Sequence, residues 1–190
     1  NGKAKYSALF SAIKNAQQSI HVEYYIFDND RIGNRLLKLL KEKADEGVEV
    51  RLIYDDVGSW SLKSRHVRQI RRDGIEAYGF MPVAFPRFTS KANYRNHRKI
   101  VVIDGRIGFT GGINIAERYL KGTKFGPWRD THLMIEGDAV NMLQAIFITD
   151  WYFVSDKKLL NDPKYFPKTK VRTRSPIQIA SSGPDSDWAS

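Results

Sequence analysis

The 190-residue sequence contains no cysteine. This excludes disulfides, thiolate catalysis and cysteine-ligated zinc from any account of the chain. Long apolar runs are also missing, because no window approaches the roughly 18 consecutive apolar residues of a membrane-spanning helix, and no signal peptide is visible at the start. We therefore expect a soluble segment. Its 42% hydrophobic and 27% charged residues are typical of a globular domain with a substantial core.

Acidic residues are scarce relative to basic ones. Lys and Arg number 31 against 21 Asp and Glu, which gives a formal net charge of +10. This balance indicates an anionic partner, and on charge alone that partner is nucleic acid, an anionic bilayer or a phosphate-bearing substrate. Many basic soluble domains bind no such partner, because net charge bears on association and not on fold. The charge alone therefore leaves both interpretations open.

Hydrophobic periodicity predicts alternating helices and strands along the chain. Helices are expected at 4–18, 34–47 and 61–74, and strands at 19–27, 48–56 and 75–80. This order predicts an α/β fold, an α-β-α sandwich with a mixed, mostly parallel sheet flanked by helices. The later elements are expected to be a loop at 81–91, a β-hairpin at 93–112, a helix from about Asn114 to residue 122, a strand at 128–137, a helix at 138–155, a basic loop at 156–176, and a strand and turn within 177–188.

The stretch that carries chemistry runs from Asn96 to Asn114 and reads NHRKIVVIDGRIGFTGGIN. Residues i and i+2 of a strand share a face, so His97 and Lys99 should point the same way, about 6.6 Å apart, with Arg98 on the other side. A neighbouring positive charge favours the neutral, nucleophilic imidazole. A shared phosphate would relieve the repulsion, with Lys99 on its oxygens and His97 attacking phosphorus or moving protons.

Residues downstream complete a predicted phosphate cradle. Gly111 and Gly112 allow close backbone approach. Asn114 adds a side-chain donor where the next helix is expected to begin, and helix N-termini bind anions. Asp104 lies in the Asp104-Gly105 hairpin turn, where an aspartate hydrogen-bonds the local backbone. A strand histidine or a DG turn by itself is more often only structural, so the prediction depends on all these groups facing one end of the hairpin.

Written as a pattern, the stretch is H-x-K, four residues, D, six residues and G-G-x-N. It resembles the HKD signature of the phospholipase D superfamily, with every position filled. The segments HVEYYIFDND, GVEVRLIYDDVGS, PWRDTHLMIEGDAV and IQIASSGPDS resemble the first catalytic half of bacterial cardiolipin synthases. The resemblance extends from about Ala4 to Asp185 and so covers nearly the whole chain.

The resemblance implies a covalent mechanism for phosphatidyl transfer. His97 would attack the phosphorus of phosphatidylglycerol and form a phosphohistidine, while Lys99 and Asn114 would hold the nonbridging oxygens. Asp104 carries the family's catalytic label, although we expect its contribution to be largely structural. Transfer to a second phosphatidylglycerol would give cardiolipin and glycerol at a membrane surface, with no metal and no cofactor.

A nucleophilic imidazole needs an acceptor that orients its far nitrogen. In the family this acceptor is an acidic residue beyond the GGxN segment, which makes Asp130 the first candidate and Glu117 the second. The alternative for Asp130 is a surface ion pair with Arg129 or another neighbour. Three aromatic residues line a lipid or headgroup path or, by the more frequent alternative, pack in the core or sheet: Trp128, Tyr24 and Tyr25.

The other histidines and a pair of carboxylates receive no role from the resemblance. His21, His66 and His132 have no matching lysine, and we interpret them as structural or surface residues. Asp55 and Asp56 follow a predicted strand, where α/β folds often place site residues. Paired carboxylates can bind a metal, but the family uses none.

The sequence departs from the family pattern in having one HKD motif instead of two. The second histidine of the family acts as general acid toward the leaving glycerol and then as base. We expect a single phospholipase D-like domain over 1–190, with 156–190 a linker and the start of the junction to a second half. The chain, which does not begin with methionine, is then either an excised half of a longer synthase or a single-motif protein that pairs with a second copy. In both cases a monomer should be a poor catalyst.

Two other functions remain open from the sequence. A phosphodiesterase or nuclease would use water as the acceptor, with lipid or DNA as its substrate. A non-catalytic module would bind anionic membranes in a salt-dependent way that survives replacement of His97. We favour membrane association of this segment with phosphatidyl transfer as its chemistry.

Overall fold

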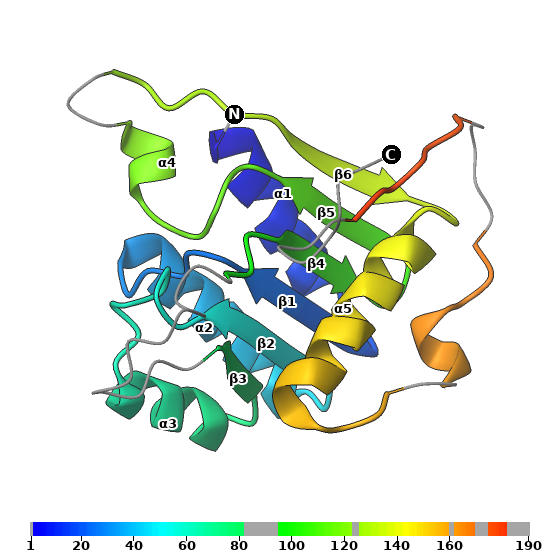
Figure 1. The fold of residues 1–190 in the computed structure, drawn as a ribbon, viewed down its shortest axis with the longest axis horizontal. Helices are drawn as coiled ribbons and strands as arrows, with labels where there is room; N and C mark the ends of the chain where they lie inside the picture. Colours follow the sequence, from blue (N-terminus) through cyan, green and yellow to red (C-terminus); the bar gives the residue numbers. More distant parts are fainter. Residues whose placement is uncertain (1, 82–94, 123–125, 160–161, 170–174, 182–190) are drawn as a thin grey trace, which may run out of the picture.

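A six-stranded mixed sheet forms the middle layer of the computed structural model, which describes residues 2–81, 95–122, 126–159, 162–169 and 175–181 (Figure 1). The strand order is β3-β2-β1-β4-β5-β6. The strands are β1 Ser19–Tyr24, β2 Glu49–Asp55, β3 Glu76–Phe80, β4 Lys99–Ile103, β5 Ile107–Gly111 and β6 His132–Glu136. β1, β2 and β3 pair in parallel, whereas the pairs β1–β4, β4–β5 and β5–β6 are antiparallel.

The expected mixed sheet flanked by helices is confirmed, but its parallel character is limited. β1, β2, β3 and β5 run in one direction, yet the described strands form only two parallel pairings against three antiparallel ones. The reason is the hairpin between β4 and β5, which reverses the chain without a crossover helix. Asp104 and Gly105 have φ of 52° and 63°, the geometry of a type I′ turn, and this confirms the predicted turn.

Helices cover both faces of this sheet (Figure 1). α1 (Gly2–Lys14), α2 (Arg31–Asp45) and α3 (Ser64–Arg72) pack their apolar stripes into one large core. α5 (Val140–Ser155) crosses the opposite face and closes two smaller clusters. No helix within the described ranges is long and apolar enough to cross a membrane.

The pleat decides which side chains of the central strand meet which layer. In β1, Ile20, Val22 and Tyr24 join the large core. The alternate residues, His21 and Glu23, face α5 and are also buried. Since a strand alternates its side chains between the two faces, β1 carries two polar groups into the α5 layer, and both need partners there.

The segment after β5 corrects the prediction of a helix starting near Asn114. The helix α4 is a single turn, Arg118–Lys121. Residues 113–115 instead lie along the segment after β1: Ile115 N donates to Ile26 O (3.0 Å), and Asp28 N donates to Ile115 O (2.8 Å). The helix is delayed because this pairing holds the backbone extended past Asn114.

Other boundaries also differ from the expectations. The strand expected at 128–137 begins only at His132. Residues 177–181 form no strand, although Ile179 packs against the cluster under α5. The rest of the strand and turn expected within 177–188, and nearly all of the loop expected at 81–91, lie outside the described residues.

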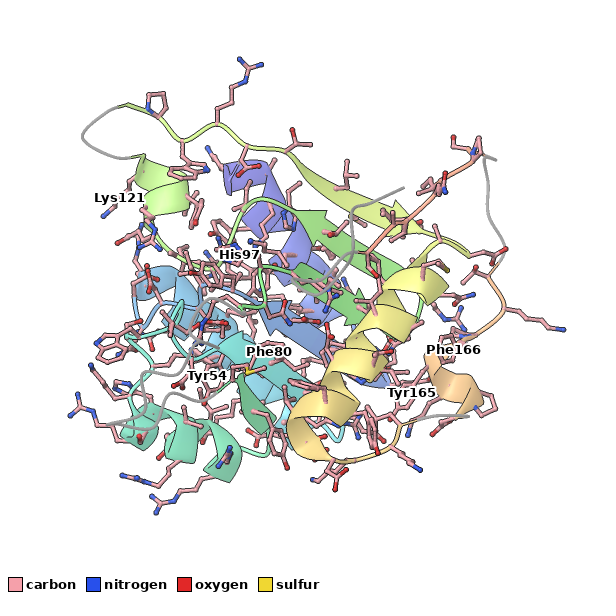
Figure 2. All side chains as sticks on the ribbon, viewed as in Figure 1. Tyr54, Phe80, His97, Lys121, Tyr165 and Phe166 are labelled. Carbon is pink, nitrogen blue, oxygen red and sulfur yellow. The ribbon has the colours of Figure 1, made fainter. Side chains whose placement is uncertain are left out.

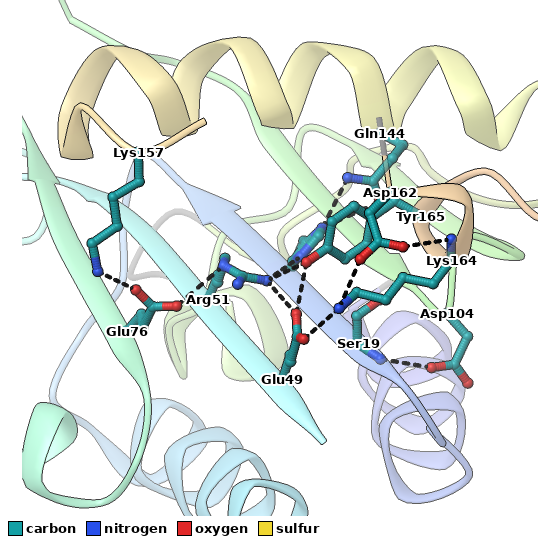
Figure 3. A network of polar contacts seen from close by, with 11 residues as sticks. Ser19, Glu49, Arg51, Glu76, Asp104, Gln144, Lys157, Asp162, Lys164 and Tyr165 are labelled. Carbon is teal, nitrogen blue, oxygen red and sulfur yellow. Dashed lines mark hydrogen bonds and ion pairs between the residues drawn. The ribbon is translucent and has the colours of Figure 1, made fainter. Parts of the chain in front are cut away.

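Part of the expected basic loop at 156–176 is docked on the sheet. A 3₁₀ turn, η2 (Pro163–Tyr165), places the Tyr165 side chain in the α5 layer with 2% exposure. The Tyr165 hydroxyl donates to the carboxylate of Glu49 (2.7 Å) and accepts from Arg51 (3.0 Å), as Figure 3 shows. These bonds attach the turn to the amino end of β2.

Candidate active site

His97 and Lys99 lie at the edge of the sheet where β1 and β2 end. β4 runs antiparallel to β1 with Lys99 opposite Tyr24, so the residues before β4 reach the carboxyl end of β1 (Figure 2). The His97 ring stacks on Tyr25, with ring centroids 3.8 Å apart, and Lys99 Nζ lies 5.5 Å from the same ring. Arg98 turns to the other face and pairs with Asp150 of α5 at 2.5 Å. The predicted alternation of these three side chains is confirmed.

The electrostatic surroundings favour a neutral imidazole at His97. Partial burial and then the charge of Lys99 lower the pKa of His97, while Asp55 opposes the shift. Burial also lowers the pKa of Lys99, and the carboxylate of Asp130 counteracts this. No hydrogen bond to the His97 ring arises from the described part of the chain. At neutral pH the imidazole therefore keeps a lone pair for reaction.

The backbone on both sides of His97 is fixed by buried polar groups. Asn96 is 6% exposed, and its side chain donates to Glu23 and accepts from Arg98 N (2.9 Å). The Asn96 N–H also donates to the carboxylate of Asp55 (3.3 Å). These contacts come from β1 and β2, so the two parallel strands hold the residue that precedes His97.

Glu23 and Asp150 are adjacent buried carboxyl groups beneath the site. Glu23 is 1% exposed, and burial followed by the charge of Asp150 raises its pKa well above the usual range. A protonated Glu23 bonded to Asp150 leaves a single negative charge for Arg98 to balance. The sequence interpretation missed Asn96, Glu23 and Asp150. The available signal for the two acids was their position inside mainly apolar stretches, Glu23 within 19–27 and Asp150 within 138–155.

The glycine pair admits the carboxylate of Asp130. A Cβ at Gly112 would lie 2.2 Å from Asp130 Oδ1, and a Cβ at Gly111 would lie 2.4 Å from Thr131 O. The Asp130 carboxylate accepts from Thr131 N (2.7 Å) and Trp128 Nε1 (3.4 Å) and influences the charge of Lys99. Within the described residues it makes no ion pair with Arg129 and no bond to His97. Asp130 therefore lies near the lysine rather than behind the imidazole.

Asn114 is inside the protein, with 4% exposure. Its Oδ1 accepts from Ile26 N (2.9 Å), and its Nδ2 donates to the Tyr119 hydroxyl (2.7 Å). Its backbone oxygen accepts from the Tyr6 hydroxyl (2.6 Å). These contacts hold the segment that follows the glycine pair, and Asn114 is not among the residues that line the cavity beside His97.

Asp104 lies at the opposite end of β4 from His97. The two are seven positions apart in sequence, which corresponds to about 20 Å along a strand. The Asp104 carboxylate accepts from the backbone N–H groups of Gln17 (2.8 Å), Gln18 (2.7 Å) and Ser19 (3.0 Å). It thus joins the hairpin turn to the start of β1, the local backbone role predicted from its turn position, and it does not reach the phosphate cradle.

The remaining candidates are distributed around the molecule. Glu117 pairs with Arg31 (2.8 Å) and Lys121 (3.1 Å), away from His97. Trp128 packs edge-on against Tyr119, with ring centroids 4.8 Å apart, and remains 41% exposed. Tyr24 is a core residue with 1% exposure. Of the three aromatic candidates for a lipid or headgroup path, Tyr25 lies beside His97 and Trp128 beside Asp130, whereas Tyr24 belongs to the core.

Asp55 is the last residue of β2 and Asp56 the first residue after it. Asp55 is 1% exposed and accepts from Val57 N (3.0 Å) and Gly58 N (2.9 Å), so it organises the turn after β2. No group of three or more potential ligands of the His, Asp or Glu type is close enough to hold a metal within the described ranges.

The three other histidines occupy different environments. His21 is fully buried under α5, and His66 bonds Asn29 and the start of α3. His132 is half-buried, and burial followed by the charges of Lys5 and Lys99 lowers its pKa to about 3. Neither ring nitrogen of His132 has a hydrogen-bond partner within the described part of the chain.

A cavity of about 950 Å³ opens beside His97 and Lys99. Residues 95–99 provide most of its charged lining, whereas α5, β6 and the segment 177–181 provide mostly apolar side chains. The apolar lining residues are Phe80, Met81, Ile100, Leu133, Ile135, Leu143, Ile146, Phe153, Ile177, Ile179 and Ala180. A phosphate at one end and hydrocarbon along the wall is the kind of ligand that this lining suits.

Comparison with known proteins gives one family match and close relatives. The family described as "Cardiolipin synthase, PLD-like domain" matches residues 9–151. The chain is 46% identical over 191 residues to a cardiolipin synthase of Geobacillus thermodenitrificans, covering 99% of this chain and 38% of that protein. It is 47% identical over 190 residues to cardiolipin synthase 2 of Staphylococcus epidermidis, covering 99% of this chain and 39% of that protein. The chain thus spans less than half the length of these curated relatives.

The fold also matches solved structures. The phospholipase D family member Nuc from Salmonella typhimurium superposes with a TM-score of 0.54 at 20% identity, covering 79% of this chain and 86% of that chain. At this identity the similarity concerns the fold alone.

Proposed function

We propose, because this chain belongs to the cardiolipin synthase, PLD-like domain family, that it forms the nucleophilic half of a phosphatidyltransferase. The observation that carries the proposal is the position of His97, which stacks on Tyr25 beside the ammonium of Lys99, with His97 and Lys99 both bordering a largely apolar cavity. The substrate is an anionic phospholipid, phosphatidylglycerol, presented at a membrane surface.

In the first step, a ring nitrogen of His97 attacks the phosphorus of phosphatidylglycerol. A nitrogen–phosphorus bond forms, and the phosphorus–oxygen bond to the headgroup glycerol breaks. The ammonium of Lys99 stabilises the charge that develops on the nonbridging oxygens. The leaving glycerol takes a proton from a general acid that a second HKD half, or a second copy of the chain, supplies.

In the second step, the primary hydroxyl of another phosphatidylglycerol attacks the phosphohistidine. The same outside group now accepts the hydroxyl proton, a new phosphorus–oxygen bond forms, and His97 leaves as neutral imidazole. The products are cardiolipin and glycerol, and neither step requires a metal or a cofactor. A chain with one histidine of this kind lacks the acid–base partner, so the active unit contains two motifs.

The neighbours of this pair take positioning roles in the proposal. Asp130 keeps Lys99 protonated despite its partial burial, because it raises the pKa that burial lowers. Asn114 holds the backbone after Gly112 in place. Asp104 acts through the fold by tying the β4–β5 turn to β1.

A chimaera tests the function without depending on activity of the isolated chain. The corresponding segment of the Geobacillus thermodenitrificans cardiolipin synthase, 46% identical, is replaced by this chain, and cardiolipin formation from labelled phosphatidylglycerol is measured. We expect activity, and we expect His97→Gln to reduce it by at least about 10³-fold.

The matched control is His66→Gln, which should leave turnover unchanged because the ring of His66 bonds Asn29, Arg65 and the start of α3, away from His97. Turnover that persists in His97→Gln would refute the nucleophile assignment. Release of glycerol with phosphatidic acid, instead of cardiolipin, would make the protein a hydrolase that uses water as acceptor.

A further inference from the structure

The loop after β2 is held rigidly beside the catalytic edge. Gly58 packs so closely on Tyr25 that an added Cβ would lie 2.2 Å from the Tyr25 carbonyl oxygen. Ser59 Oγ donates to the same oxygen (3.1 Å) and accepts from Phe27 N (3.0 Å). Ser61 Oγ accepts from Asn29 N (2.8 Å). The loop is therefore fixed to the residues that follow β1. One of these residues is Tyr25, whose ring stacks on the ring of His97.

Trp60 projects from this fixed loop into solvent. Its side chain is 69% exposed, although Ser59 and Ser61 on either side are hydrogen-bonded to the protein. Val57 in the same loop is 41% exposed. Lys63 Nζ lies 5.1 Å from the centre of the Trp60 ring. A large aromatic side chain held outward next to a cation has the chemistry of residues that sit at a membrane–water interface.

α3 continues this surface with a stripe of arginines. Val67 and Ile70 face the core. Arg65, Arg68 and Arg72 follow a spacing of i, i+3 and i+7, so they share the face that points away from it. No ion pair to these three arginines or to Lys63 forms within the described part of the chain.

Two lysines of α2, in contrast, form ion pairs within their own helix. Lys38 pairs with Glu42 (3.9 Å) and Lys41 with Asp45 (2.6 Å), both one turn along the helix. α3 has no acidic residue within its bounds. The cations of α3 are therefore concentrated on one surface without local neutralisation, which gives that surface a positive potential.

We propose that Trp60, Lys63, Arg65, Arg68 and Arg72 form a docking surface for an anionic bilayer containing phosphatidylglycerol. The cations suit the headgroup phosphates, and Trp60 suits the interfacial layer beneath them. This inference rests on the proposed function and adds the surface by which the domain meets its substrate layer. Since the loop carrying Trp60 is fixed to Tyr25, docking through it brings His97 to the level of the lipid headgroups.

Vesicle sedimentation of the purified chain tests the proposal. We expect binding to phosphatidylcholine vesicles that contain phosphatidylglycerol, weak binding to phosphatidylcholine alone, and loss of binding at high salt. Replacing the three arginines together, as R65Q/R68Q/R72Q, should weaken vesicle binding on the order of 100-fold. Trp60→Ser should weaken it roughly 10-fold, because the indole no longer enters the interface.

A matched control separates this surface from net charge. K38Q/K41Q/K157Q removes the same three positive charges from lysines that already pair with Glu42, Asp45 and Glu76. It should weaken vesicle binding less than about threefold. Tyr152→Ser, from an aromatic residue 45% exposed on α5, is the control for Trp60. Circular dichroism of each variant checks that the fold is retained.

Three outcomes would overturn the proposal. The lysine control could weaken vesicle binding as much as the arginine variant, which would show that net charge alone acts. The arginine variant could bind vesicles as the parent does, which would place the surface elsewhere. The arginine variant could lose binding to duplex DNA while keeping vesicle binding, which would make α3 a nucleic-acid surface.

The experiments distinguish an error in the proposed docking surface from an error in the proposed function. If the proposed function is wrong, the parent chimaera makes no cardiolipin, whatever the vesicle result. If only the docking surface is wrong, the chimaera forms cardiolipin and the arginine variant binds vesicles as the parent does. If both are right, the arginine variant of the chimaera loses activity on vesicles but keeps it on detergent-dispersed phosphatidylglycerol, where no bilayer has to be reached.

Discussion

The two ends of the sheet each hold a histidine beside a cation, and the ring nitrogens of the two histidines have opposite surroundings. At the amino end of β1, His21 Nε2 accepts from Arg51 (3.3 Å), and Nδ1 lies 2.9 Å from Nε2 and 3.2 Å from Oε1 of the Gln144 amide. Its ring stacks on Phe147 with centroids 4.5 Å apart. At the carboxyl end, His97 stacks on Tyr25 but has no bond to its ring nitrogens from the described residues.

Both pKa values fall for the same reasons, with burial the larger cause and the neighbouring cation next. The direction of a pKa shift therefore does not separate a reactive histidine from a structural one. What separates them is whether partners already use the ring nitrogens and whether a cavity reaches the ring. His97 borders the cavity of about 950 Å³, and His21 does not.

The amino end is organised as a closed network of partners (Figure 3). Glu49 accepts from Arg51 (2.8 Å), Tyr165 (2.7 Å) and Lys164 (2.5 Å). Burial opposes ionisation of Glu49, but these hydrogen bonds together lower its pKa to about 2. Each group there stabilises the others, so the expected phenotype of a substitution is loss of stability. At the carboxyl end, the expected phenotype is loss of activity.

The largest expected effect comes from replacing each of the two histidines separately in the chimaera. His97→Gln should lower cardiolipin formation by at least about 10³-fold with an unchanged melting temperature. His21→Gln should lower the melting temperature while the activity per folded molecule is kept. Activity assays and thermal unfolding of the same two preparations measure this, and a fall in activity per folded His21→Gln molecule would contradict the comparison.

The next effect is the removal of a buried cation from the amino end. Arg51→Met leaves the carboxylate of Glu49 and the ring of His21 without their shared donor, so we expect a loss of about 3 kcal/mol in the free energy of unfolding. Urea unfolding measures it. Lys41→Met, which breaks an exposed pair with Asp45, is the control and should change nothing measurable.

The pH dependence of stability should reveal His21. Its pKa is about 3 in the folded protein and near 6.5 when unfolded, so below pH 6.5 the unfolded chain binds a proton that the folded chain does not. Stability is then complete above pH 6.5 and falls as the pH drops toward 3. At pH 5 the loss attributable to His21 is about 2 kcal/mol.

Urea unfolding at pH 7 and pH 5 measures this loss. His21→Gln should remove this contribution to the difference in unfolding free energy between pH 7 and pH 5. His97→Gln should leave most of that difference in place. Equal slopes for the parent and His21→Gln would show that His21 is not the titrating group. His132, whose pKa is also lowered to about 3, would then be the group to replace next.

The smallest expected effect tests the one HKD residue that lies at the amino end. Asp104→Asn keeps one acceptor oxygen but loses charge-assisted bonds to three backbone N–H groups. We expect a loss of about 1 kcal/mol in stability, with chimaera activity following the folded fraction. A drop in activity of the fully folded variant would show that Asp104 contributes to catalysis beyond its structural role.

The fold and half of the site could be predicted because they depend on local patterns. The alternation of His97, Arg98 and Lys99, the Asp104-Gly105 turn and the order of helices and strands follow from periods of two and 3.6 residues. The helix expected from Asn114 was wrong, because a pairing with residues 26–28, far away in sequence, overrides the local preference.

The sequence by itself therefore determined the family of the chain and placed His97 and Lys99, the pair proposed to react, on one face of a strand. Only the tertiary structure decided that Asn96 is held by Glu23 and Asp55, that Asp130 approaches Lys99 across Gly112, and that Asp104 lies about 20 Å away along β4. The physical reason is that side-chain alternation is a property of one strand. The contacts of a buried carboxylate depend instead on how separate strands and helices register against each other, and this is settled when the core packs.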